Sequence, residues 1–148
     1  MCNERGFTLA ETMIATVVLV IGLVAVALIF PYAVRSNTSS RQTTTATMIV
    51  ADKMEALRAL PLTAPALAAG GGLNPASPVN GYHDYVTVAP NGVMTVSATP
   101  SPSAYLRLWQ ISGTNPKTIT IVMYAMRHGL SGRPTEVTRS STIVTDTF

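Results

Sequence analysis

The first third of the chain is dominated by one uninterrupted apolar run. From Thr12 to Val34 there is no charged residue, and almost every side chain is Ile, Val, Leu, Ala, Met or Phe. As an α-helix these positions would rise about 35 Å, against about 30 Å for the hydrocarbon core of a bilayer. Nothing later in the chain is long or apolar enough for a second span. The run therefore predicts a single transmembrane helix.

A polar interval follows, and then an amphipathic pattern. After an interval rich in Ser, Thr and Asn, apolar side chains recur at helical spacing, at Ala46, Val50, Met54 and Leu57. The charged residues of this stretch are expected on the opposite face: Asp52, Lys53, Glu55 and Arg58. Pro61 closes the segment. We expect one long helix with a weak polar middle, in which residues 7–34 form the membrane half and residues 35–60 lie against a sheet.

Residues 61–103 are rich in residues that break regular structure. Seven of the ten prolines fall here, together with three successive glycines at 70–72. Two short strands are expected, at Tyr82–Ala89 and Val93–Ala98, with a hairpin turn at Asn91-Gly92. The remainder is either a loosely packed loop or a surface that faces a partner.

The last third, residues 104–148, has the alternation of β-strands. Strands are predicted at Ala104–Ile111, Thr118–Met126 and Thr135–Thr145. In the first, Arg107, Trp109 and Ile111 are expected on one face and Leu106 and Leu108 on the other. A meander of at least three antiparallel strands against the helix makes the predicted fold class α+β.

Composition agrees with a membrane-resident part. Charged residues make up 11% of the chain and hydrophobic residues 47%, whereas soluble domains carry about 25% charged residues. The net charge of +3 comes from scattered basic residues, so no nucleic-acid partner is expected. The one cysteine, Cys2, is interpreted as an incidental residue of a leader, and no disulfide is possible within the chain.

The amino terminus does not look like an ordinary secretory signal. Such a signal has a basic start, a short apolar core and a small-residue cut site after that core. Here a polar leader of residues 1–6 ends in Gly6, and the apolar run follows Phe7. An ordinary cut site of small-x-small form exists at Ala25-Val26-Ala27, but it is embedded in apolar sequence.

Glu11 is the exceptional residue of the apolar helix. A carboxylate at depth in a bilayer costs about 2.5–3.5 kcal/mol on insertion scales, so a partner is expected. If the chain is cut after Gly6, the new α-amine of Phe7 could pair with Glu11 of a neighbouring subunit. Alternatively, Glu11 lies among the lipid headgroups as an acid favoured by the helix dipole.

The stretch Arg5-Gly6-Phe7-Thr8-Leu9-Ala10-Glu11, followed by an apolar helix, resembles the prepilin signal of type IV pilins and type II secretion pseudopilins. The resemblance implies cleavage after Gly6 by the prepilin peptidase, N-methylation of Phe7, and a role for Glu11 in subunit contacts. It also implies that the leader lies in the cytoplasm. Gly22 and Pro31 interrupt the run as helix breakers, with a kink or local unwinding expected near Pro31.

The pattern from Ala46 to Arg58 and the terminal strands resemble minor pilins of the pilus modification type and a minor pseudopilin of type II secretion. The implied function is a structural minor subunit of a type IV pilus or a type II secretion pseudopilus. Its partners would be the prepilin peptidase, other pilin or pseudopilin subunits and the inner membrane. Its head would be periplasmic or part of a surface filament. The alternative is a membrane-anchored periplasmic binding domain that does not polymerise.

No catalytic residue, metal site, cofactor or small-molecule substrate is predicted. His83 and His128 are isolated in sequence, and no metal-ligand spacing, phosphate loop or nucleophile motif occurs. Asp84 follows His83, but adjacent residues of a strand point to opposite faces. The sequence therefore predicts a protein that is not an enzyme.

Overall fold

The computed structural model describes residues 7–101, 105–126 and 133–145. In order along the chain, its elements are α1 (Leu9–Arg58), the 3₁₀ helix η1 (Pro65–Leu67), β1 (Gly70–Gly71), β2 (His83–Val88), β3 (Met94–Ser97), β4 (Tyr105–Ser112), β5 (Lys117–Ala125) and β6 (Thr135–Val144). Two compact units share this chain: the amino-terminal part of α1 up to Arg41, and a head that begins at Gln42.

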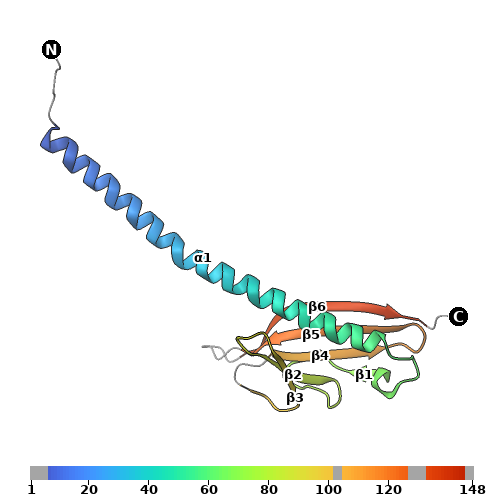
Figure 1. The fold of residues 1–148 in the computed structure, drawn as a ribbon. Coiled ribbons are helices and arrows are strands. Elements are labelled where there is room, and N and C mark those ends of the chain that lie inside the picture. Colours follow the sequence, from blue (N-terminus) through green and yellow to red (C-terminus); the bar gives the residue numbers. More distant parts are fainter. Residues whose placement is uncertain (1–6, 102–104, 127–132, 146–148) are drawn as a thin grey trace. The chain divides into compact units, whose positions relative to one another are not determined.

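One antiparallel sheet forms the body of the head (Figure 1). The strand order is β3-β2-β4-β5-β6, and β1 pairs with β4 beyond the end of β2. The predicted hairpin at Asn91-Gly92 is confirmed as β2 and β3, and the three later strands are confirmed as β4, β5 and β6. The short strand β1 was not predicted, because two glycines carry no strand signal.

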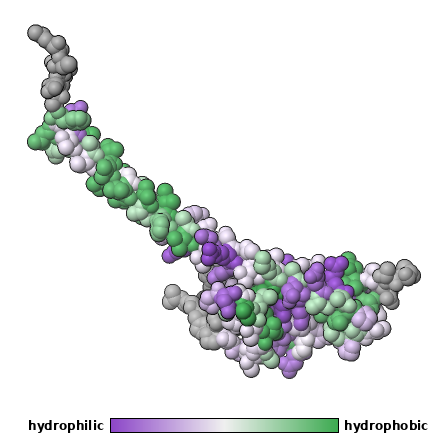
Figure 2. Space-filling model, viewed as in Figure 1, coloured by the Kyte–Doolittle hydropathy of each residue, from purple (hydrophilic) through white to green (hydrophobic). Residues whose placement is uncertain are grey.

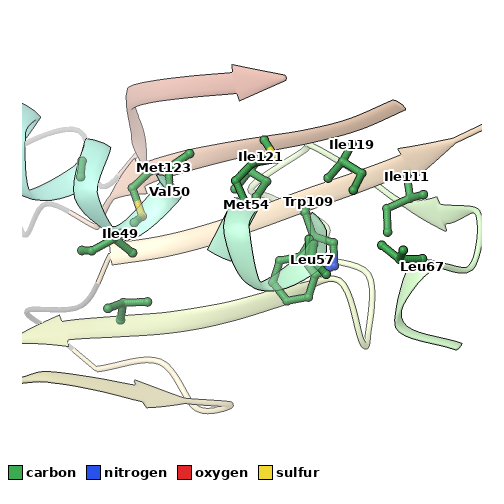
Figure 3. Packing of buried hydrophobic residues seen from close by; sticks show 12 residues of the cluster. Ile49, Val50, Met54, Leu57, Leu67, Trp109, Ile111, Ile119, Ile121 and Met123 are labelled. Carbon is green, nitrogen blue, oxygen red and sulfur yellow. The ribbon is translucent and has the colours of Figure 1, made fainter. Parts of the chain in front are cut away.

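The helical part of the head packs on one face of the sheet. Ile49, Val50, Met54 and Leu57 of α1 point toward β4 and β5, and Leu67 closes the same cluster (Figure 3). From the strands the cluster takes Trp109, Ile111, Ile119, Ile121 and Met123, all at most 6% exposed. This confirms the predicted α+β arrangement of a long helix whose second half lies on an antiparallel sheet.

The opposite face of the sheet has a second, smaller core. Leu106, Leu108, Val122 and Tyr124 are buried there, and Leu73 packs against them. The Tyr124 hydroxyl donates to the Leu73 carbonyl at 2.9 Å, which ties the loop after β1 to this face. The predicted alternation of β4 is therefore confirmed, because Trp109 and Ile111 lie on the helix side while Leu106 and Leu108 lie on the other.

The segment between α1 and β2 is held by side chains that reach backbone carbonyls. The Lys117 ammonium on β5 donates to the carbonyls of Leu62 and Leu67, both at 2.7 Å. The Tyr82 hydroxyl donates to the carbonyl of Ala68 at 2.9 Å. These bonds satisfy carbonyls that no ladder would pair, so this proline-rich segment is fastened to the sheet.

Candidate functional site

The start of α1 is closed by two residues that bond each other reciprocally. The Thr8 amide and the Thr8 hydroxyl donate to the Glu11 carboxylate at 3.3 and 3.2 Å, and the Glu11 amide donates to the Thr8 hydroxyl at 3.3 Å. This is a capping box, in which an N-cap threonine and a glutamate three residues later satisfy each other's free amides. Because the macrodipole favours an acid in the first turn, the position also suits the charge of Glu11.

The capping box changes how Glu11 is understood. The sequence suggested a charged neighbour or the headgroup zone for Glu11, whereas the local signal for the box is the Thr-x-x-Glu spacing. Within one chain, Thr8 supplies hydrogen bonds to the carboxylate but no charge to balance it. In the part of the chain that the structure describes, no basic side chain forms an ion pair with Glu11. Gly6 lies outside the described residues, and Phe7 is 85% exposed.

The amino-terminal half of α1 presents exposed apolar side chains. The large apolar residues between Phe7 and Val34 are 51–85% exposed, and Figure 2 shows them as a nearly continuous apolar surface on the visible face. By length and composition this helix could cross a membrane. Such a surface is unstable in water, so it is consistent with anchoring in a membrane or with incorporation in a filament of similar helices.

Gly22 and Pro31 both lie within α1, which remains helical through each of them. Gly22 has open space where a side chain would be. Melting of the helix at these residues during subunit packing stays a prediction.

Arg107 and Asp84 form a buried ion pair in the head. On β4, the Arg107 guanidinium donates to both carboxylate oxygens of Asp84 on β2, from Nε at 2.8 Å and from Nη2 at 2.7 Å. Its Nη1 donates to the carbonyl of Ile49 in α1 at 2.9 Å. Arg107 is 4% exposed and Asp84 9%. The arginine therefore joins two strands and the helix through three hydrogen bonds.

Lys53 also faces the sheet, which corrects the expectation that it lies on the solvent side of the helix. Its ammonium lies 4.0 Å from the centre of the Trp109 ring and 3.7 Å from an Asp84 oxygen. The Lys53 side chain is only 23% exposed, so its charged end is partly withdrawn from water and rests on the aromatic ring, as in a cation–π contact. Burial lowers the pKa of Lys53, and the Arg107 charge acts in the same direction against the attraction of Asp84.

His83 and Asp84 do not form an acid–base pair. The His83 Nδ1 lies 2.9 Å from the Val79 carbonyl, and its ring meets Tyr85 edge-on at 5.8 Å between centres. Asp84 points to the other face of β2, toward Arg107. Among the residues that the structure describes, no group of three His, Cys, Asp or Glu side chains could hold a metal ion. His128 lies outside the described residues.

A long amino-terminal helix whose second half lies on an antiparallel sheet defines a pilin-like α+β architecture. Residues 1–27 match a protein-family model described as the prokaryotic N-terminal methylation motif. The match includes Gly6, Phe7, Glu11 and the first part of the apolar run, and it supports a prepilin-like amino terminus of the type IV pilin kind, found on structural proteins. No curated protein and no solved structure matches the chain.

Proposed function

We propose that this chain is a structural minor subunit of a type IV pilus or a type II secretion pseudopilus, assembled through its amino-terminal helix. The observation that carries the proposal is the methylation motif over residues 1–27, joined to an apolar helix whose described side chains are all exposed up to Arg41. A helix of this kind needs lipid before assembly and neighbouring helices afterwards. The head has a core of its own.

The processing step follows from the same motif. Prepilin peptidase would cut between Gly6 and Phe7 and methylate the new terminus. Cleavage leaves a positive amine at Phe7, next to the capping threonine. In a stack of parallel helices this amine is the charge that could neutralise Glu11 of a neighbour, since Thr8 offers the carboxylate only neutral donors.

The minor-subunit assignment rests on the pattern between Ala46 and Arg58 and on the terminal strands, which resemble minor pilins and one minor pseudopilin. That resemblance is looser than the motif at the amino terminus. It favours a subunit present in few copies over the main subunit of a filament.

The second candidate is a membrane-anchored periplasmic binding domain that does not polymerise. The capping box favours it to the extent that Glu11 already has a role within a single chain. In that case the carboxylate only closes the first turn of the helix, and no neighbour is needed.

Two substitutions at Glu11 separate these functions. Glu11→Gln keeps an acceptor for the Thr8 amide and hydroxyl, since glutamine also serves in capping boxes, but it removes the charge. If Glu11 pairs with a neighbouring amine, Glu11→Gln and Glu11→Ala should both insert in the membrane and fail to enter filaments. If Glu11 is only a cap, Glu11→Gln should behave like the wild type. The readout is recovery of the subunit in sheared filaments from cells that express the prepilin peptidase and the other subunits.

A further inference from the structure

Three successive parts of α1 differ in what surrounds the backbone. Residues 9–34 carry large apolar side chains that lipid or other helices would cover. From Ala46 to Leu57 the helix is packed on the sheet. Between them, residues 36–45 are polar, and none of their side chains is buried. In this middle part the helical backbone has no apolar coat, and only Gln42 and Thr45, where the head begins, are half-buried.

The middle part is also built from poor helix formers. Eight of its ten residues are Ser, Thr or Asn, and the other two are Arg41 and Gln42. Serine, threonine and asparagine have low helix propensity, because their side chains bond nearby backbone groups in other conformations. The Thr38 hydroxyl, for example, donates back to the Val34 carbonyl at 2.9 Å. Such bonds slightly destabilise and bend helices.

The packed part begins with a fixed contact. The Arg107 bond to the Ile49 carbonyl is buried, and the same guanidinium is held by Asp84. Ala46 is 0% exposed and Ile49 1%. To unwind beyond this point, the helix would have to leave the core. The buried Arg107 guanidinium would then lose its acceptor at Ile49, which is costly.

We propose that residues 36–45 are a conformational device: a segment of α1 that unwinds while the flanking helix stays folded, with the Arg107–Ile49 contact setting the point where unwinding stops. A helix rises 1.5 Å per residue and an extended chain about 3.3 Å. Full unwinding of this segment would therefore lengthen the chain by roughly 18 Å with the head intact. The inference concerns a single chain and holds whether or not it enters a filament.

Hydrogen exchange followed by mass spectrometry on the full chain in detergent micelles tests the segment directly. Amides of residues 36–45 should exchange at least about tenfold faster than those of residues 46–58 and of residues 14–30, because local opening releases the least protected bonds first. Equal protection of residues 36–45 and 46–58 would overturn the proposal.

Variants within residues 36–45 test whether low helix propensity causes the unwinding. Replacing Ser36, Ser39, Ser40, Thr43 and Thr44 together by Ala should slow exchange in residues 36–45 about tenfold, whereas Thr12→Ala with Thr16→Ala should leave it unchanged. No slowing in the alanine variant would contradict the role of propensity.

Substitution of Arg107 tests whether its contact with Ile49 stops the unwinding. Arg107→Met should extend fast exchange into residues 46–50 while β5 stays protected. If that variant loses the sheet as well, Arg107→Lys serves instead, because one ammonium cannot hold both Asp84 oxygens and also reach Ile49. Unchanged protection of residues 46–50 in a folded Arg107 variant would refute the stop.

Discussion

The Arg107 guanidinium holds Asp84 through two parallel hydrogen bonds of 2.8 and 2.7 Å, in a site that is almost closed to water. Planar arginine matches a carboxylate in this bidentate way, which lysine does not. Removal of Arg107 leaves Asp84 buried with only the longer contact to the Lys53 ammonium, at 3.7 Å. The pair therefore fixes how β2, β4 and the head part of α1 fit together.

We predict that Arg107→Met destabilises the head by about 3–5 kcal/mol, as expected when one partner of a buried pair is lost. Urea unfolding of the full chain in mild detergent, followed by the fluorescence of Trp109, measures the change. The double variant Arg107→Met with Asp84→Leu should recover part of the loss, since it leaves no buried charge.

The exposed pair on β6 is the matched control. Arg139 donates to both oxygens of Glu136, with contacts of 3.1 and 3.0 Å, but both side chains are open to solvent. Water and salt screen such a pair, so Arg139→Met should change the unfolding midpoint very little. Equal losses at Arg107 and Arg139 would contradict the role given to burial.

The lowered pKa of Lys53 should make the free energy of unfolding of the head depend on pH in the alkaline range. In the folded protein, burial lowers the pKa of Lys53 below the ordinary lysine value of 10.5. At a pH between these two values, Lys53 therefore binds more protons in the unfolded chain than in the folded one. Stability contributed by this residue should therefore rise as pH increases through that window. Unfolding of wild type and Lys53→Met as a function of pH checks it. The wild type should gain stability relative to the variant on the alkaline side, and a relative loss would disprove the assignment.

Ile49 and Ile29 both lie in α1 but differ in burial, so their substitution tests whether the head folds independently of the exposed half. Ile49 is 1% exposed and Ile29 is 64% exposed. Ile49→Ala should cost about 2–5 kcal/mol in unfolding of the head, because it empties a packed site. Ile29→Ala should leave that unfolding unchanged. A similar loss for both would mean that the head and the amino-terminal half do not fold independently.

Gly71 and Gly92 share a positive φ but differ in the space around them, so substituting each distinguishes the cost of backbone conformation from that of steric contact. Gly71 and Gly92 have φ of 85° and 82°, a region costly for residues with a side chain, by roughly 1–2 kcal/mol. A Cβ at Gly92 would meet open space, whereas at Gly71 it would collide with the Trp109 carbonyl and with the Tyr82 ring. Gly71→Ala should therefore destabilise the head clearly more than Gly92→Ala in the same urea experiment. Equal costs would show that conformation alone matters.

Much of the fold could be predicted because the periods are clear. Alternation placed β4 with Trp109 and Ile111 on one face, and helical spacing identified Ala46, Val50, Met54 and Leu57 as the packed side of the helix. The predicted hairpin needed only Asn91-Gly92 between two β-branched runs. In each case the local sequence pattern and the tertiary packing favour the same secondary structure and the same buried face.

The rest depends on contacts between residues far apart in sequence. Asp84 and Arg107 are 23 positions apart, and nothing local says that their strands are neighbours in the sheet. Lys53 was expected at the surface because its charge suggested solvent, but its ammonium reaches the Trp109 ring and Asp84. By contrast, the Thr8–Glu11 box had a local signal, since a threonine followed three residues later by glutamate is typical of a helix start.

The mature amino terminus is the most direct test of whether this chain is processed as a prepilin. Intact mass together with amino-terminal sequencing of the protein, purified from membranes of cells that contain the prepilin peptidase, gives the answer. We predict a chain that begins at Phe7, carries one added methyl group on its α-amine and keeps the entire apolar helix. A chain that begins at Met1, or near Leu28 after cleavage at Ala25-Val26-Ala27, would contradict the account.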